Sequence, residues 1–545
     1  MDGIDRRALF RDGAVAVAVA VLPACKGKAE PPKPAPPPVP HPVDAGLAQP
    51  ATDIVENSIA DLASKLASKK ETSVSLVDKY TARINALNEQ LHAVLEVNGE
   101  AAAIAKQLDD ERAAGKLRGP LHGIPLLVKD NIDTGDKMMT TAGSLALDGS
   151  PAAKDAFVID KLRKAGAIIL GKTNLSEWAN FRGMQSSSGW SARGGQCRNP
   201  YAFDRTASGS SSGSAAATAA SMCPASLGSE TDGSITSPAS MTSLVGIKPT
   251  IGLVSRAGVI PIAISQDTVG PITRTVADAA MILTAIAGTD PEDAATATAK
   301  PEDYTKYLDV NALKGARLGV PRKGVFGLNR NTDALMTTAL DKLKELGAVL
   351  VDPVDFEIPP DLQDAELAVF FGEMKPAMEA YLKRRPDAKM KNLADIIAFN
   401  TAHADRELHL YGQEFLEKAQ AAGGMTDKAY LDARATCLKI AREQLDTLTA
   451  KNKLDAFVMP TGSLPWLIDP TGDAAAANGF GAPTFPAIAG YPHISVPAGD
   501  FLGLPFGLSL FGAAYSEGKL FGYAFAYEQA TKHRRPPKYL PTAAL

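Results

Sequence analysis

The chain has 545 residues, enough to bury a large hydrophobic core without help from disulfides or metals. Its 45% hydrophobic and 22% charged residues exclude a largely disordered chain, a collagen and a polytopic membrane protein. A formal net charge of −4 gives no basic excess for binding a polyphosphate, so we expect no nucleic-acid partner. The four cysteines lack C-x-x-C spacing and the histidines lack H-E-x-x-H spacing, so neither a zinc ribbon nor a zinc protease is predicted.

Residues 1–25 have the pattern of an export signal. Arg6 and Arg7 precede an apolar run over 13–22, which is too short to cross a hydrocarbon core of about 30 Å and suits a signal peptide. The arginine pair resembles a twin-arginine signal, and the segment 22–25 resembles a bacterial lipobox, which would attach a lipid to Cys25. The alternative is an ordinary thiol at Cys25 beside a conventional cleavage site. We therefore expect a periplasmic protein, or a lipoprotein anchored to the membrane through Cys25 and facing the periplasm.

Residues 26–50 are predicted to be a proline-rich linker. Eight of the thirteen residues 31–43 are proline, a composition that favours an extended polyproline II spacer. The alternative is a disordered leader with no spacing role. Because no later shift in composition marks a boundary, we expect residues 51–545 to form one catalytic domain.

Helical patterns come first in this domain and then alternate with short apolar runs. Apolar spacing predicts one helix beginning at Ser73 and a second over 98–112, both ahead of any strand. The strand-like runs, bounded by Gly and Pro, are 125–128, 167–170, 318–320, 349–351, 456–459, 494–496 and 505–510. This alternation predicts an α/β fold in which helices sandwich a mixed β-sheet, with a peripheral helical insertion at 360–450.

The strongest compositional bias lies in residues 208–233, which are rich in Gly and Ser and contain an alanine-rich helical run over 215–220. Small residues let a backbone approach a ligand closely and turn its N–H groups toward an anion. Residues 209–213 fit the G-x-S-x-G nucleophile elbow with Ser211 as nucleophile, but the elbow needs a preceding strand and 199–205 has the composition of a loop. A phosphate-binding loop is the second interpretation, but it would need a lysine after the glycines, and none follows them here. The third interpretation is a serine hydrolase whose base is a lysine made neutral by burial.

Five segments in order resemble those of the amidase signature family, and the resemblance covers about residues 70–530. The segments are 123–131, 171–175, 208–238, 246–250 and 267–271. The family fold is a mixed sheet sandwiched by helices, and its triad is Ser-Ser-Lys. Matched residue by residue, the resemblance implies Ser234 as nucleophile, Ser210 as bridging serine after a cis Gly209-Ser210 peptide, and Lys129 as base.

The residue types agree with these roles. Lys129 ends an apolar strand, where burial favours a neutral amine, and the hydroxyl of Ser210 both donates and accepts, so it can relay a proton from Ser234. The resemblance further implies an oxyanion hole of backbone N–H groups from Thr231, Asp232, Gly233 and Ser234. Ser211 adjoins the bridging serine and either helps to orient it or has a purely structural role. No metal or cofactor enters this chemistry.

The segment around Ser234 departs from the common family pattern. Asp232 stands where many members have glycine, and Thr236 stands where many have arginine. This variant resembles bacterial peptide amidases, which implies hydrolysis of the C-terminal amide of a short peptide, or of another small amide, to a carboxylate and ammonia. The first alternative is an amidotransferase subunit that passes ammonia to a partner acting on charged tRNA. The predicted export argues against this alternative. The second is a catalytically silent, exported binding protein.

Overall fold

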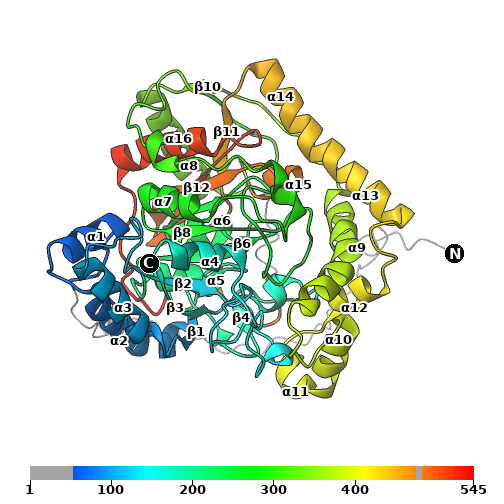
Figure 1. The fold of residues 1–545 in the computed structure, drawn as a ribbon. Coiled ribbons are helices and arrows are strands. Elements are labelled where there is room, and N and C mark those ends of the chain that lie inside the picture. Colours follow the sequence, from blue (N-terminus) through cyan, green and yellow to red (C-terminus); the bar gives the residue numbers. More distant parts are fainter. Residues whose placement is uncertain (1–52, 474–480, 545) are drawn as a thin grey trace, which may run out of the picture. The chain divides into compact units, whose positions relative to one another are not determined.

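The computed structural model describes residues 53–473 and 481–544. Within these residues, eleven strands form one mixed β-sheet (Figure 1). The strand order is β1-β3-β2-β6-β8-β7-β12-β13-β11-β9-β10. The strands are β1 (Val94–Val97), β2 (Pro125–Lys129), β3 (Ile168–Thr173), β6 (Ala225–Glu230), β7 (Val245–Lys248), β8 (Thr268–Thr273), β9 (Arg317–Gly319), β10 (Val349–Val351), β11 (Ala456–Pro460), β12 (His493–Phe501) and β13 (Leu504–Phe511). A separate ribbon pairs β4 (Trp190–Ser191) with β5 (Gly195–Gln196). The predicted signal, linker and Cys25 lie outside the described residues.

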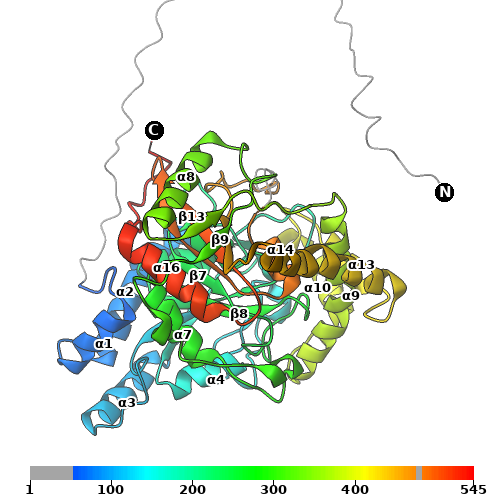
Figure 2. The same ribbon diagram turned by 90° about the horizontal axis from the view of Figure 1, so that it is seen from above.

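Helices flank this sheet, as the α/β prediction requires. They are α1 (Ile59–Ala67), α2 (Ser73–Leu91), α3 (Ala101–Ala113), α4 (Phe157–Lys164), α5 (Ser212–Ala219), α6 (Thr236–Met241), α7 (Val276–Ile286), α8 (Arg330–Glu345), α9 (Leu362–Lys383), α10 (Leu393–Ala402), α11 (Ala404–Glu407), α12 (Glu414–Ala421), α13 (Lys428–Leu438), α14 (Gln444–Asn452), α15 (Thr484–Ala489) and α16 (Glu517–Thr531). Helices α7 and α16 lie side by side over the sheet, and α13 and α14 run in line through a π-helical turn, Lys439–Glu443 (Figure 2). The fold class is confirmed.

Helix α2 begins at Ser73, as predicted, because two reciprocal hydrogen bonds of a capping box close its first turn. Thr72 Oγ1 accepts from the Ser75 N–H at 3.0 Å, and Ser75 Oγ accepts from the Thr72 N–H at 2.8 Å. The apolar residues whose spacing predicted the helix all lie on its buried face. They are Leu76, Val77, Tyr80, Ile84 and Leu87.

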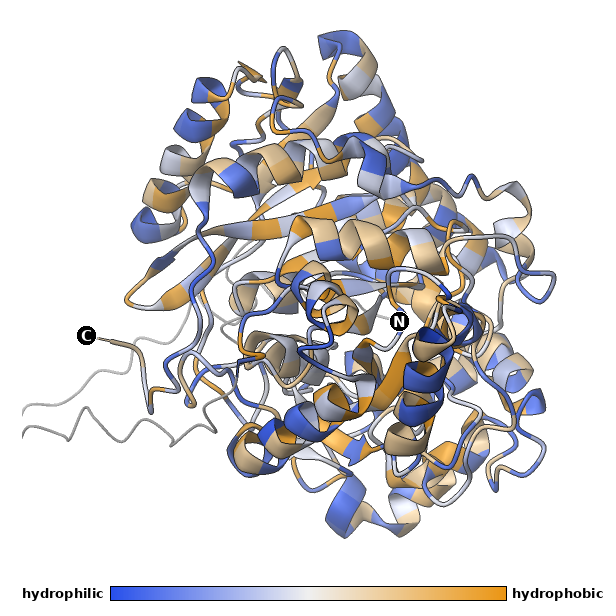
Figure 3. Cartoon of the chain, turned by 60° about the vertical axis from the view of Figure 1, so that its left-hand side comes forward, coloured by the Kyte–Doolittle hydropathy of each residue, from blue (hydrophilic) through white to orange (hydrophobic). Residues whose placement is uncertain are grey.

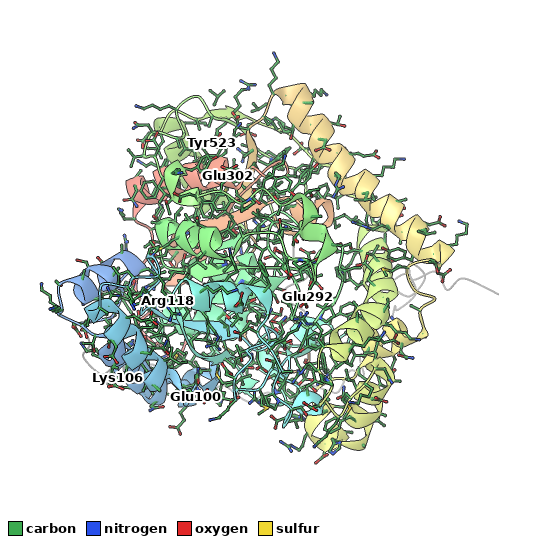
Figure 4. All side chains as sticks on the ribbon, in the orientation of Figure 1. Glu100, Lys106, Arg118, Glu292, Glu302 and Tyr523 are labelled. Atoms are coloured by element: carbon green, nitrogen blue, oxygen red, sulfur yellow. The ribbon has the colours of Figure 1, made fainter. Side chains whose placement is uncertain are left out.

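Hydrophobic residues are frequent in the strands, whereas the outer helices alternate hydrophilic and hydrophobic stretches (Figure 3). Strand β2 shows the pattern most clearly, because Leu126, Leu127 and Val128 are almost completely buried. Charged side chains such as Glu100 and Lys106 project outward from the N-terminal helical layer, where Lys106 pairs with Asp110 (Figure 4). Such exposed ion pairs contribute little to stability, so burial of the strands dominates. No helix of the described residues combines the length and apolarity needed to span a bilayer.

The expectation that the helices from Ser73 and over 98–112 both precede any strand is wrong, because β1 lies between them, after α2 and before α3. This edge strand pairs antiparallel with β3, but only Val94 of its four residues is buried, so it has no clear apolar pattern. Strand β6 was also missed, since its sequence ASLGSE contains few residues that favour strands. It forms because it lies between β2 and β8, in contact with α5.

The Gly/Ser segment is part of the packed core. Every residue of α5 is buried, and the Gly213 N–H donates to the Asn174 carbonyl at 3.0 Å, which ties the helix to the end of β3. A Cβ at Gly213 would lie 2.5 Å from Asn174 O and 2.6 Å from Asn174 N, and closer still to the Ala93 carbonyl. Only glycine therefore allows this close approach.

Gly213→Ala should lower the free energy of unfolding by about 2 kcal/mol, because the added methyl group meets backbone atoms that cannot move independently. Chemical denaturation followed by circular dichroism measures the change. Gly99→Ala is the matched control, since a Cβ at Gly99 meets no atom within 4 Å. Equal stabilities of the two variants would contradict the packing argument.

Candidate active site

The predicted site residues come from neighbouring parts of the sheet. Strands β2 and β6 are parallel neighbours, with Leu127 opposite Ser226 and Val128 opposite Leu227. Their carboxyl ends therefore meet at one edge, where Lys129 ends β2 and the loop that carries Ser234 follows β6. Ser210 lies just before the start of α5, in a segment that reaches the same edge of the sheet.

Lys129 is buried completely, and its side-chain nitrogen lies among oxygen atoms. Nζ is 2.8 Å from Ser210 Oγ, 2.9 Å from Ser229 Oγ and 3.1 Å from the Ser229 carbonyl oxygen. Burial lowers the pKa of Lys129 to about 7, although the charges of Glu230 and Asp267 act in the opposite direction. A large fraction of the amine is therefore neutral near pH 7 and able to accept a proton.

Ser210 and Ser211 link the start of α5 to the loop after β6. The Gly209-Ser210 peptide is cis, and the Ser211 N–H donates to the Ser234 carbonyl at 3.1 Å. Ser211 Oγ donates to the Ser229 carbonyl at 3.1 Å and accepts from the Ser229 N–H at 3.3 Å. Ser211 thus braces the backbone of Ser229, and its side chain makes no hydrogen bond to Ser210 in the described structure.

The loop 231–235 folds into a tight turn around a buried carboxylate. Glu230 Oε2 accepts from the N–H groups of Ile235 at 2.7 Å and Thr236 at 2.9 Å. Within the described part of the chain, the N–H groups of residues 231–234 donate to no acceptor. Four consecutive free N–H groups beside a serine are able to hold an oxyanion.

Two further groups hold this loop from outside. Thr231 Oγ1 donates to Asp267 Oδ1 at 2.6 Å, and Asp267 Oδ2 accepts from the N–H groups of Ile262 and Ala263. Thr484, at the start of α15, donates to Asp232 Oδ2 at 2.9 Å. The loop is therefore fixed by side chains from both of its flanks.

A second buried lysine, Lys172 on β3, belongs to the structural framework. Its Nζ donates to the Ile132 carbonyl at 2.6 Å and to Thr140 Oγ1 at 2.8 Å, and it lies 3.9 Å from Asp130. None of these partners belongs to the predicted site. These contacts give Lys172 a packing role.

Sequence reasoning missed Ser229 and Asn131. Ser229 supplies two of the three oxygen neighbours of Lys129 Nζ, and Asn131 Nδ2 donates to Ser229 Oγ at 2.9 Å. The signal was available in part, because Asn131 follows Lys129 by two residues and Ser229 lies within the Gly/Ser segment. What the sequence does not show is the alignment of β2 with β6 that brings Ser229 to Lys129.

Comparisons with known proteins identify the family of the chain. The family model described as "Amidase" matches residues 75–521. The chain belongs to the amidase family. A probable amidase of Arabidopsis thaliana is 42% identical over 89% of this chain and 92% of its own length. The solved structure of a peptide amidase from Stenotrophomonas maltophilia is 46% identical, with a TM-score of 0.85 over 89% of this chain and 99% of that one.

The family also contains proteins with a different role. A glutamyl-tRNA(Gln) amidotransferase subunit of Anaeromyxobacter sp. is 35% identical over 89% of this chain and 98% of its own length. The amidase match and the peptide amidase structure together make the chain an amidohydrolase that acts on amides. The predicted family resemblance is confirmed.

Ser229→Ala should lower kcat/KM for amide hydrolysis by about 10- to 100-fold, because Lys129 loses one polar partner and Asn131 loses its acceptor. Ammonia release measures the change. Ser229→Thr is the control, since it keeps the hydroxyl on a strand that accommodates β-branched residues. Activity of the alanine variant within twofold of wild type would show that this contact is dispensable.

Proposed function

We propose that this amidase uses Ser234 as nucleophile, Ser210 as bridging serine and Lys129 as base, and that it removes the C-terminal amide of short peptides. The observation that carries the proposal is the completely buried Lys129 amine, 2.8 Å from Ser210 Oγ at the edge of the sheet where Ser234 lies. A lysine in water would be protonated at neutral pH and could not act as a base.

The contacts of Lys129 leave the lone pair of its nitrogen free to accept a hydrogen bond from Ser210. A neutral amine has two N–H groups and one lone pair. The Ser229 carbonyl can only accept, so it takes one N–H, and Ser229 Oγ, which also accepts from Asn131, takes the other. The remaining neighbour, the Ser210 hydroxyl, then donates its proton to Nζ. This arrangement supports a base that acts through Ser210.

The reaction follows with its protons balanced. Ser210 gives its proton to Lys129 and takes the proton of Ser234, whose oxygen attacks the amide carbon. The free N–H groups of residues 231–234 stabilise the oxyanion. The C–N bond then breaks as the leaving nitrogen takes a proton through Ser210, which is replenished by Lys129, and ammonia departs. Water repeats the sequence on the acyl-enzyme and releases the carboxylic acid and Ser234.

Peptide amides are the favoured substrates because of the likeness to the Stenotrophomonas maltophilia peptide amidase over 99% of its chain. An amidotransferase subunit is the alternative that the 35% identical relative supports. Export argues against that alternative, since charged tRNA is cytoplasmic. We also propose that residues 1–25 direct export to the periplasm and that Cys25 carries a lipid anchor; both residue groups lie outside the described structure.

Ser234→Ala should lower kcat for ammonia release from an N-acetylated dipeptide amide by at least about 10⁴-fold, since no other group replaces the attacking oxygen. Ser240→Ala is the matched control, because Ser240 Oγ on α6 is buried without a hydrogen-bond partner among the described residues. We expect its activity to stay within twofold of wild type. Substantial turnover by the Ser234 variant would exclude Ser234 as nucleophile, and a wild-type enzyme inactive on the peptide amide would refute the substrate.

The activity should also depend on the protonation of Lys129. Its pKa is lowered from 10.5 to about 7, so the amine takes up a proton and loses its basic lone pair as the pH falls below 7. We expect kcat/KM to fall about tenfold per pH unit below pH 7, and Lys129→Ala to lower kcat by about 10²- to 10⁴-fold. A profile that stays flat down to pH 5 would contradict a lysine base.

A further inference from the structure

Asp232 places a carboxyl group two residues before the proposed nucleophile. One oxygen, Oδ2, accepts from Thr484 Oγ1 at 2.9 Å, whereas Oδ1 accepts no hydrogen bond from the described residues. The residue is only partly buried, and no Lys or Arg of the described chain forms an ion pair with it. The proposed triad and oxyanion hole use its backbone N–H but leave this side chain without a role.

The groups around Asp232 do not neutralise it. Burial raises the pKa of Asp232 to about 7, with the charge of Glu230 adding to the effect, while Thr484 and Lys248 oppose it. At pH 8.5 the carboxyl group is therefore ionised, and Lys129, with a pKa of about 7, is mostly neutral. Burial also lowers the pKa of Lys248 to about 8, so its positive charge is reduced at pH 8.5.

Of the two other acids near the loop, Asp267 adds negative charge. Asp267, whose pKa burial raises to about 6, is ionised at pH 8.5 and accepts from Thr231. Glu366 adds little charge, because burial and the charge of Asp232 raise its pKa well above the usual range and so favour its neutral form. At pH 8.5 the nucleophile loop therefore lies beside the negative charges of Asp232 and Asp267, while the base is mostly neutral.

Amide hydrolysis changes the charge of the ligand at this position. The substrate carboxamide is neutral, and the product is a carboxylate released from the oxygen of Ser234. Two residues of chain separate Cα atoms by at most about 7 Å, so the product is formed close to Asp232. Two carboxylates about 7 Å apart repel each other enough to change an affinity by about tenfold or more when water is partly excluded.

We propose that Asp232 is a specificity-determining residue, whose carboxylate excludes anionic ligands from the site. It weakens binding of the product acid, and it disfavours substrates with an acidic residue at the scissile amide relative to neutral or basic ones. The proposal rests on the proposed function through the position of Ser234. It names a substrate class for the site, amides without negative charge near the reacting bond.

The test compares wild type, Asp232→Asn and Thr484→Val at pH 8.5 with N-acetyl-Gly-Leu amide as substrate and N-acetyl-Gly-Leu as product inhibitor. The measured quantity is the ratio of the inhibition constant of the acid to the KM of the amide. Asp232→Asn removes the charge and keeps the shape, so we expect this ratio to fall at least about tenfold. Thr484→Val keeps the charge and removes the hydrogen bond, so we expect its ratio to stay within threefold of wild type.

A second readout uses amides of matched peptides that end in Glu, Leu or Lys. In wild type the Glu amide should have the lowest kcat/KM, and Asp232→Asn should reduce that penalty. If Asp232→Asn folds poorly, Asp232→Gly, with the residue that many family members carry, gives the same comparison. The proposal is overturned if the ratio is unchanged in the Asp232 variants, or if Thr484→Val shifts it equally. A failure of the proposed function is distinct, since Ser234→Ala would then remain active.

Discussion

The burial of one amine governs the rest of this site. Lys129 lies at the end of a strand whose residues are all buried, and it meets no carboxylate within ion-pair distance among the described residues. Taking a charged ammonium out of water without a counter-ion costs several kcal/mol, and the protein avoids this cost by keeping the amine neutral. The same condition that would destabilise an ordinary lysine here produces a base.

The surroundings of Lys129 explain the composition of the Gly/Ser segment. Hydroxyls and carbonyls solvate the neutral amine without supplying a charge, and small residues let α5 and β6 approach it closely. A Cβ at Gly228, for example, would lie 2.7 Å from Ser211 Oγ, which is bonded to the backbone of Ser229. The segment is rich in small residues because it is tightly packed, and the linker-like appearance of its sequence is misleading.

Much of the architecture was predictable wherever local pattern and burial agree. The start of α2, the strand that ends at Lys129 and the strands β9 to β13 follow from apolar runs with clear boundaries. The structure departs from the sequence prediction where long-range pairing overrides local preference. Strand β8 contains Gly270 and Pro271, and β6 contains two serines and a glycine, yet these two strands pair with each other and are flanked by β2 and β7.

In the site, too, some residues were predictable from the sequence and others were not. Motif resemblance pointed to Lys129, Ser210 and Ser234, which the fold brings to one edge of the sheet. It did not point to Ser229, because the distance between Ser229 and Lys129 depends on the relative register of β2 and β6. The contacts of Asp232 with Thr484 and of Thr231 with Asp267 were hidden for a similar reason, since they join segments that are remote in sequence.

These remote contacts have a consequence for how the enzyme acquires activity. Lys129 is separated by 81 residues from Ser210 and by 100 residues from its partner Ser229. Chains dominated by such distant pairings order slowly, since the entropy of closing large loops is lost before the contacts form. No short fragment contains all three groups, so recovery of amidase activity during refolding reports the assembly of the central strands and not the earlier formation of helices.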